Sequence, residues 1–260
     1  MHKRFFFFLL VLVIGASCTR YKDIVYVRDL GKTTSDSLIK TTYTTYKVQA
    51  SDILYIKIRS SINPTAAEIF NKTSSTSENT YYYNTSNYYL IGYPVDLGGY
   101  INIAVLGDIK VAGLTMKEIE QELQNKAREI VSDAEVVVRL LSFKITVLGE
   151  IGSGQKNIMA ERANLFEVFA MSGDILKSGN KHNVLIMRTT PEGIKTFRVD
   201  VTDKNLISSP LFYVQPNDII YVEPAKITAV RLTLNELALF ITSVSSVVTL
   251  SLLVYNLVQK

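Results

Sequence analysis

The chain has 260 residues, a single cysteine and a formal net charge of +4. A lone cysteine excludes a disulfide within one chain, and this length predicts one large or two small domains that are stable without one. Basic residues are interspersed among acidic residues along the sequence, which argues against a nucleic-acid-binding face. No nucleic-acid partner is therefore expected.

Residues 1–17 have the pattern of a secretory signal peptide. A short basic start precedes ten uncharged apolar residues, Phe5 to Ile14, which are too few to span a bilayer. Cys18 follows the small-residue exit and resembles the lipid-modified cysteine of a lipobox, although Gly15 stands where that motif usually has leucine. We expect Cys18 to carry a covalent lipid anchor. The alternative is an ordinary cleaved signal peptide followed by an incidental cysteine.

The mature chain is expected to begin with a polar, lipidated tether over residues 18–42. No acidic cluster directly follows the cysteine, which favours a body that faces the periplasm. From Tyr46 to Arg59, polar and apolar residues alternate as in a β-strand. Residues 71–89 are rich in Asn, Ser, Thr and Tyr, a composition that buries little aliphatic surface, so they are expected to form an inserted loop or hairpin.

A helix is predicted after Thr115, because Thr115 and Glu118 form a capping box. Its spacing predicts a buried stripe of Ile119, Leu123, Ala127 and Ile130. Two strands follow, and their junction near Ser142 is expected to end a first domain over residues 43–142.

A second domain is expected over residues 143–226. Asn164, with Glu167 three residues later, predicts the start of a short helix that ends near Gly173. Further strands are predicted at Asn183–Arg188 and Thr196–Val201. Strands and short helices mix without a steady βαβ rhythm, so the predicted fold class is α+β, with two small mixed α/β domains.

One short sequence pattern occurs in both expected domains. Val48–Ile56 reads VQASDILYI, and Val214–Val222 reads VQPNDIIYV. The shared pattern indicates a turn whose aspartate, Asp52 or Asp218, caps backbone N–H groups and begins a strand. The match is too short to establish duplicated domains.

The C-terminal segment, residues 233–258, is predicted to be a membrane helix. Leu237 to Val258 are 22 residues without a charge. As a helix this stretch is ~33 Å long, enough to cross a hydrocarbon core. Polar residues gather on about a third of its circumference, which suits the lining of a pore: Thr242, Ser245, Ser246, Thr249 and Asn256. Two alternatives are helix packing within a membrane through small hydroxyl residues, and a buried helix of a soluble domain.

Several of these stretches resemble the polysaccharide-export outer-membrane lipoproteins, the Wza-like family. The first domain carries the resemblance at Tyr46–Ile58 (YKVQASDILYIKI) and over Tyr89–Leu123. The second resembles a soluble-ligand-binding β-grasp (SLBB) module, at Val147–Gln155, Asn164–Gly173, Asn183–Arg188 and Val214–Pro224. The chain departs from larger relatives in its Tyr-rich insertion and in having one β-grasp module, which affects the expected dimensions of an assembly.

The resemblance implies a homo-oligomeric ring, expected to be an octamer, beneath a bacterial outer membrane. Each subunit would contribute its C-terminal helix to an α-helical pore for capsular polysaccharide or exopolysaccharide. The lipid on Cys18 would fasten the ring to outer-membrane lipid, and an inner-membrane polysaccharide co-polymerase would dock from below.

The sequence offers no pattern that indicates catalysis, a metal or a cofactor. His182, beside Lys181 in a polar turn, is expected to be a surface residue. No His, Cys and carboxylate spacing suggests zinc, and nothing resembles a phosphate loop or a nucleophile elbow. An export channel without enzymatic activity is therefore the leading hypothesis. A tethered periplasmic adaptor or glycan-binding lipoprotein without a pore is the alternative, and an envelope glycan-processing enzyme ranks last.

Overall fold

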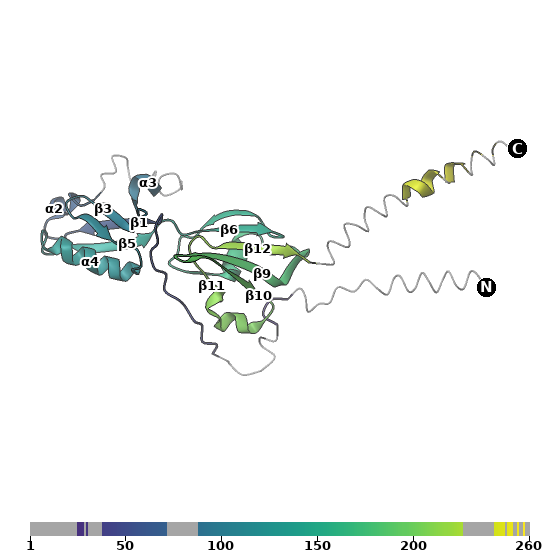
Figure 1. The fold of residues 1–260 in the computed structure, drawn as a ribbon, viewed down its shortest axis with the longest axis horizontal. Coiled ribbons are helices and arrows are strands. Elements are labelled where there is room, and N and C mark those ends of the chain that lie inside the picture. Colours follow the sequence, from purple (N-terminus) through teal and green to yellow (C-terminus); the bar gives the residue numbers. More distant parts are fainter. Residues whose placement is uncertain are drawn as a thin grey trace.

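The computed structural model describes residues 25–28, 30, 38–71, 88–225, 242–247, 249–251, 254 and 257. The predicted signal peptide, Cys18, Asn256 and most of the predicted insertion lie outside these residues. The described chain forms a mixed α/β protein with two hydrophobic cores, which belong to the two units seen in Figure 1. Leu140 packs against both cores and marks their junction.

The first unit is built on a three-stranded antiparallel sheet of order β2-β1-β5. A separate hairpin, β3-β4, and helix α4 complete its core. Strand β1 buries Leu54, Ile56 and Ile58 on one face because successive side chains of a strand point to opposite sides. The elements are β1 (Ile53–Arg59), α2 (Pro64–Glu68), α3 (Tyr88–Ile91), β2 (Tyr93–Pro94), β3 (Tyr100–Ile103), β4 (Gly107–Lys110), α4 (Met116–Arg128) and β5 (Glu135–Leu140).

Helix α4 begins with the predicted capping box. The Thr115 side chain accepts a hydrogen bond from the Glu118 backbone N–H, and the Glu118 carboxylate accepts one from the Thr115 backbone. Ile119, Leu123 and Ala127 are buried as predicted. Ile130 is 50% exposed, so the prediction that it belongs to the buried stripe was wrong. The helix ends at Arg128, and the turn that follows buries Val131 instead.

The second unit has a five-stranded mixed sheet of order β10-β9-β12-β6-β7. Two antiparallel hairpins, β6-β7 and β9-β10, flank β12, which runs parallel to β6 and antiparallel to β9. The elements are β6 (Lys144–Gly149), β7 (Gly154–Asn157), β8 (Ala163–Asn164), α5 (Leu165–Met171), β9 (Gly179–Thr190), β10 (Gly193–Val199), β11 (Tyr213–Val214) and β12 (Ile219–Pro224), with 3-10 turns η4 (Lys204–Ser208) and η5 (Pro210–Phe212) before β11.

Helix α5 follows its sequence signals closely. Asn164 and Glu167 form the predicted capping box, and the helix gives way at Ser172, one residue before Gly173. Leu165, Val168 and Phe169 bury its inner face in the second core. The predicted strand at Asn183–Arg188 is longer than expected, since β9 runs from Gly179 to Thr190.

The described C-terminal residues, 242–247, 249–251, 254 and 257, are helical. Within the portion of the chain that the structure describes, no helix is both long and apolar enough to cross a membrane. Most of the predicted membrane helix lies outside that portion, so the span over residues 233–258 stays a prediction.

Candidate functional site

A cleft of about 1150 Å³ lies between the two units. One wall is the face of β1 and β5 that points away from the first core, and the opposite wall comes from residues 158–161 and 213–216 of the second unit. Residues 43–46, which lead into the first unit, form a third side. Five tyrosines line the cleft: Tyr43, Tyr46, Tyr55, Tyr88 and Tyr213.

Two matched turns lie beside this cleft, and they are the repeated sequence pattern. The carboxylate of Asp52 accepts a hydrogen bond from the Gln49 backbone N–H at 2.9 Å, and Asp218 accepts one from Gln215 at 2.8 Å. The residue before each aspartate has a positive φ, 71° at Ser51 and 64° at Asn217. The predicted capping role of both aspartates is therefore confirmed, and each turn begins a strand, β1 or β12.

Asp52 connects the end of the tether to the junction between the units. Its carboxylate accepts hydrogen bonds from the Tyr46 hydroxyl at 2.7 Å and from the Ser142 hydroxyl at 3.2 Å. Burial raises the pKa of Asp52, while the hydrogen bonds from Gln49, Tyr46 and Ser142 oppose that rise. Burial, followed by the charges of Asp52 and Asp218, raises the pKa of Tyr46 well above its ordinary value. The carboxylates of both aspartate turns therefore raise the pKa of the same side chain, Tyr46.

Asp218 is held by a buried ion pair within the second unit. The Arg188 guanidinium donates two hydrogen bonds to its carboxylate, at 2.9 and 2.7 Å. Only 11% of the Arg188 side chain and none of the Asp218 side chain is exposed. Burial raises the pKa of Asp218, and Arg188 opposes that rise. This pair fixes the turn that forms the second unit's edge of the cleft.

The described residues 25–28 and 38–47 precede the first unit, are called the strap here, and contact the second unit through Tyr26, Val27, Arg28 and Tyr43. The backbone N–H groups of Val27 and Arg28 donate to the carbonyl oxygens of Val201 and Thr202, at 3.2 and 2.6 Å. The Tyr26 ring packs against two aromatic rings of α5, Phe166 and Phe169, and the Lys181 ammonium lies 3.8 Å from its centroid. At the strap's other end, Tyr43 meets Tyr213 edge to face, with centroids 5.4 Å apart.

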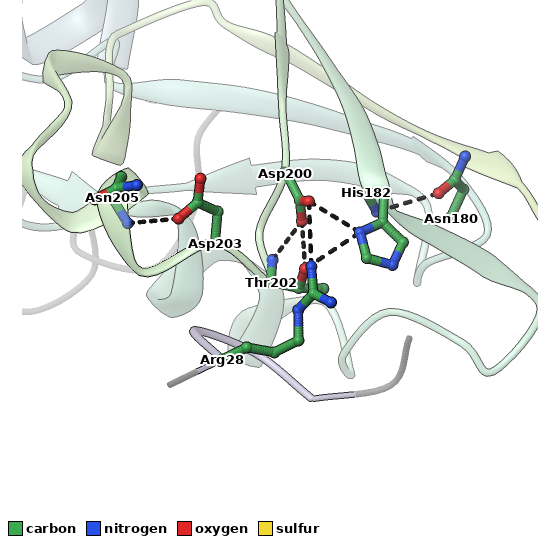
Figure 2. A network of polar contacts seen from close by, with 7 residues as sticks. All are labelled: Arg28, Asn180, His182, Asp200, Thr202, Asp203 and Asn205. Carbon is green, nitrogen blue, oxygen red and sulfur yellow. Dashed lines mark hydrogen bonds and ion pairs between the residues drawn. The ribbon is translucent and has the colours of Figure 1, made fainter. Parts of the chain in front are cut away.

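A polar cluster fastens the strap near its start, and Figure 2 shows Arg28 reaching from the strap toward Asp200. The Asp200 carboxylate lies 3.8 Å from Arg28, 2.9 Å from His182 Nδ1 and 2.6 Å from the Thr202 hydroxyl. Burial would raise the pKa of Asp200, but hydrogen bonds from Thr202 and His182 outweigh it and lower the pKa. His182 is thus a partly exposed member of an ordered cluster, which the sequence did not reveal.

This cluster does not have the geometry of a nucleophilic triad. Asp200 and Thr202 both approach the same ring nitrogen of His182, Nδ1, whereas a triad places the carboxylate and the nucleophile on opposite nitrogens. Thr202 is also fully buried. Among the described residues, no group of three or more His, Cys, Asp and Glu could hold a metal ion. The cluster links the strap to the second unit through Arg28 and Asp200.

Four of the five predicted pore-lining residues are described, and they lie on successive helical turns. The Ser246 hydroxyl donates to the Thr242 carbonyl oxygen, and the Thr249 hydroxyl donates to that of Ser245, both at 2.8 Å. Hydroxyls bonded to their own helix in this way satisfy their donors without a second chain. The described apolar residues of the segment are 49–68% exposed: Val244, Val247, Leu250, Val254 and Leu257.

Residues 40–141 match the polysaccharide biosynthesis/export protein family. The matched segment spans the whole first unit, from β1 to β5. It is similar to the EPS I polysaccharide export outer membrane protein EpsA of Ralstonia solanacearum, with 33% identity over 102 residues. EpsA of Ralstonia nicotianae is 35% identical over 88 residues. These alignments cover 37% and 32% of this chain, but only 27% and 23% of the relatives' lengths.

The match confirms the family resemblance that the sequence carries in its export domain, as the first unit is called from here on. The matched segment begins in the strap and ends at Leu141, beside the Ser142 hydroxyl that binds Asp52. The cleft therefore has the export domain as one wall.

Proposed function

We propose that this chain is a subunit of an outer-membrane channel that exports a capsular polysaccharide or exopolysaccharide. The observation that carries the proposal is the family match over residues 40–141. The similarity to export proteins of the outer membrane in two Ralstonia species supports the same assignment. In this proposal the protein conducts polymer and performs no catalysis.

The strap supports a specific orientation of the protein. Tyr26 packs on the second unit only eight residues after Cys18, so a lipid on Cys18 would hold that unit within about 28 Å of the membrane surface. The chain leaves the same unit at Pro224, the end of β12, toward the C-terminal segment. Both proposed membrane attachments therefore belong to the second unit. The export domain would then face away from the outer membrane, toward an inner-membrane co-polymerase.

The second unit is proposed to be a β-grasp module. Its last strand, β12, lies between two hairpins and runs parallel to the first strand, β6, while α5 packs on the same core. That strand order supports the SLBB resemblance found in the sequence.

The pore is proposed to be a ring of C-terminal helices, one from each copy in a homo-oligomer, with an octamer as the expected size. Thr242, Ser245, Ser246 and Thr249, with Asn256, would face the water-filled lumen. The exposed valines and leucines of the same segment would face lipid or neighbouring helices.

The native mass of the mature protein in mild detergent tests the channel. Full-length protein and protein truncated after Arg231 are compared, and particles of both are imaged. We expect closed rings from the full-length form and loss of the central pore on truncation. A stable monomer or dimer in several mild detergents would instead favour the tethered adaptor.

A cellular experiment tests export itself. In the source bacterium, removal of this chain should abolish surface polysaccharide, and the full-length protein should restore it. Unchanged surface polysaccharide after removal would reject the export role.

A further inference from the structure

Strand β1 has two chemically different faces. Leu54, Ile56 and Ile58 point into the first core, whereas Tyr55, Lys57 and Arg59 alternate with them and line the interdomain cleft. Arg139 extends this polar face, since it stands opposite Tyr55 in the pairing of β1 with β5. Among the described residues, a sheet face with a tyrosine and three basic groups is therefore turned toward the cleft.

The charge of the cleft is unbalanced in favour of positive groups. Its lining contains four basic residues, Lys57, Arg59, Lys117 and Arg139, and two acidic residues, Glu120 and Glu161. Lys117 pairs with Glu120 at 3.4 Å, and Arg139 pairs with Glu161 at 3.6 Å. Glu135 stands opposite Arg59 on β5, but it lies outside the cleft lining. Across the described residues, neither Lys57 nor Arg59 forms an ion pair within 4 Å.

The ion pair between Arg139 and Glu161 shows what kind of group the cleft accepts. It crosses from the export domain to the second unit and places a carboxylate against the basic face. The two side chains are 55% and 79% exposed, so the pair is weak and solvated. A carboxylate from a ligand can replace Glu161 with little loss, and Lys57 and Arg59 on the same sheet add positive charge beside it.

Aromatic rings complete the recognition surface. Tyr43 and Tyr213 meet at the rim, and the guanidinium carbon of Arg162 lies 6.0 and 5.8 Å from their ring centroids. Aromatic faces carry a negative quadrupole that attracts polarised C–H groups, while the tyrosine hydroxyl offers a hydrogen bond. Pyranose rings present both features, an apolar C–H face and a rim of hydroxyls. The cavity, at about 1150 Å³, exceeds the usual range for one small molecule and has room for several such rings.

We propose that the cleft binds an anionic oligosaccharide stretch, with Lys57, Arg59 and Arg139 contacting its acidic groups and the rim tyrosines contacting its sugar rings. This inference rests on the proposed export function and adds to it a polymer class: a polysaccharide that carries carboxylate or other acidic substituents. A segment from a second copy of the chain is the competing occupant.

The test measures binding of a defined acidic glycan to the mature full-length protein in detergent. Isothermal titration with oligogalacturonate is compared with titration of a neutral maltooligosaccharide of the same length. The variant Lys57→Ala/Arg59→Ala removes two charges from the cleft. The matched control, Lys177→Ala/Lys195→Ala, removes two charges from exposed positions outside it. Thermal unfolding of each variant verifies that it is folded.

The proposal predicts that the cleft variant weakens oligogalacturonate binding by about tenfold or more, as expected for lost charge-assisted contacts, while the control binds normally. The neutral glycan should bind more weakly to the wild type and respond little to either variant. Equal binding of acidic and neutral glycans, or equal losses in both variants, would overturn it. A changed native mass of the cleft variant, without changed glycan binding, would assign the cleft to a neighbouring copy and would also overturn it.

Export by the cleft variant separates this inference from the function on which it rests. If the cleft variant restores surface polysaccharide fully and the wild type binds no acidic glycan, the cleft proposal fails while the export function stands. If removal of the whole chain leaves surface polysaccharide unchanged, the export function itself fails.

Discussion

Asp218 and Arg188 form an ion pair that is more enclosed than the other pairs within the described part of the chain. Arg188→Ala would leave the Asp218 carboxylate buried without its counter-charge. We expect this change to lower the free energy of unfolding by about 3–5 kcal/mol, because a buried charge that loses its partner keeps its desolvation cost. Urea denaturation of wild type and variant measures the difference. A loss no larger than that of Lys195→Ala, an exposed ion-pair partner, would contradict it.

The same variant should show a defined pH dependence. Burial raises the pKa of Asp218, and without Arg188 the folded-state pKa rises further above the unfolded value. A raised folded pKa means that the folded state binds the proton more tightly than the unfolded state. The destabilisation by the buried Asp218 charge is therefore complete above the folded pKa and is lost below the unfolded pKa. The penalty of Arg188→Ala should therefore shrink as the pH falls through the raised folded pKa toward the unfolded pKa, about 4. The double variant Arg188→Ala/Asp218→Asn should lack this dependence.

Among the helices, α4 offers the clearest test of a local sequence signal. Thr115→Ala removes the side-chain acceptor for the Glu118 backbone N–H while the core residues stay in place. The expected cost is about 0.5–2 kcal/mol, the usual range for a lost N-cap. Thermal or urea unfolding gives the value, with Gln121→Ala on the exposed face of the same helix as the control. If Thr115→Ala left the free energy of unfolding unchanged, water would be shown to replace the hydrogen bond of the cap.

The strap depends on a carboxylate whose pKa is lowered. Because hydrogen bonds keep the folded pKa of Asp200 below its unfolded value, the stabilisation is present above about pH 4 and is lost as pH falls through the folded pKa. Hydrogen-exchange protection of the Val27 and Arg28 amides should fall over that range. Asp200→Asn should show reduced protection at neutral pH, a loss below about 1 kcal/mol because the cluster is partly open to solvent. Identical protection in both proteins at all pH values would contradict the assignment.

Local signals were readable from the sequence, and long-range contacts were not. The capping boxes of α4 and α5 and both aspartate turns involve residues three apart, so their spacing sufficed. Ile130 was misassigned because the 3.6-residue period continues past the point where the backbone leaves the helix. Arg188 as the partner of Asp218 lies 30 residues away, and no pattern links them.

The cleft was also beyond sequence reasoning. The alternation from Tyr46 to Arg59 predicted a strand, but what the polar face of that strand meets depends on how the two units and the strap come together. Tyr43 and Tyr213, which meet at its rim, are 170 positions apart in the chain.

On the scale of the whole molecule, two separate attachments to the membrane are proposed, and their loss should not be equivalent. Cys18→Ser removes the lipid, and truncation after Arg231 removes the C-terminal helix. Each single change should leave much of the protein in the membrane fraction, whereas the combination should release it. Sedimentation of membranes followed by immunodetection measures the distribution. Complete release by Cys18→Ser alone would show that the C-terminal segment does not insert.

The strap also determines which part of the protein bears mechanical force. The chain enters and leaves the export domain at one place. There the Leu141 N–H donates to the Ile53 carbonyl oxygen, and the Asp52 carboxylate accepts hydrogen bonds from Tyr46 and Ser142. Val27 and Arg28 are already bonded to the second unit, and the chain leaves that unit again at Pro224. Tension between the two attachments would therefore run through the strap and the second sheet. The export domain would lie outside that line and would not be stretched.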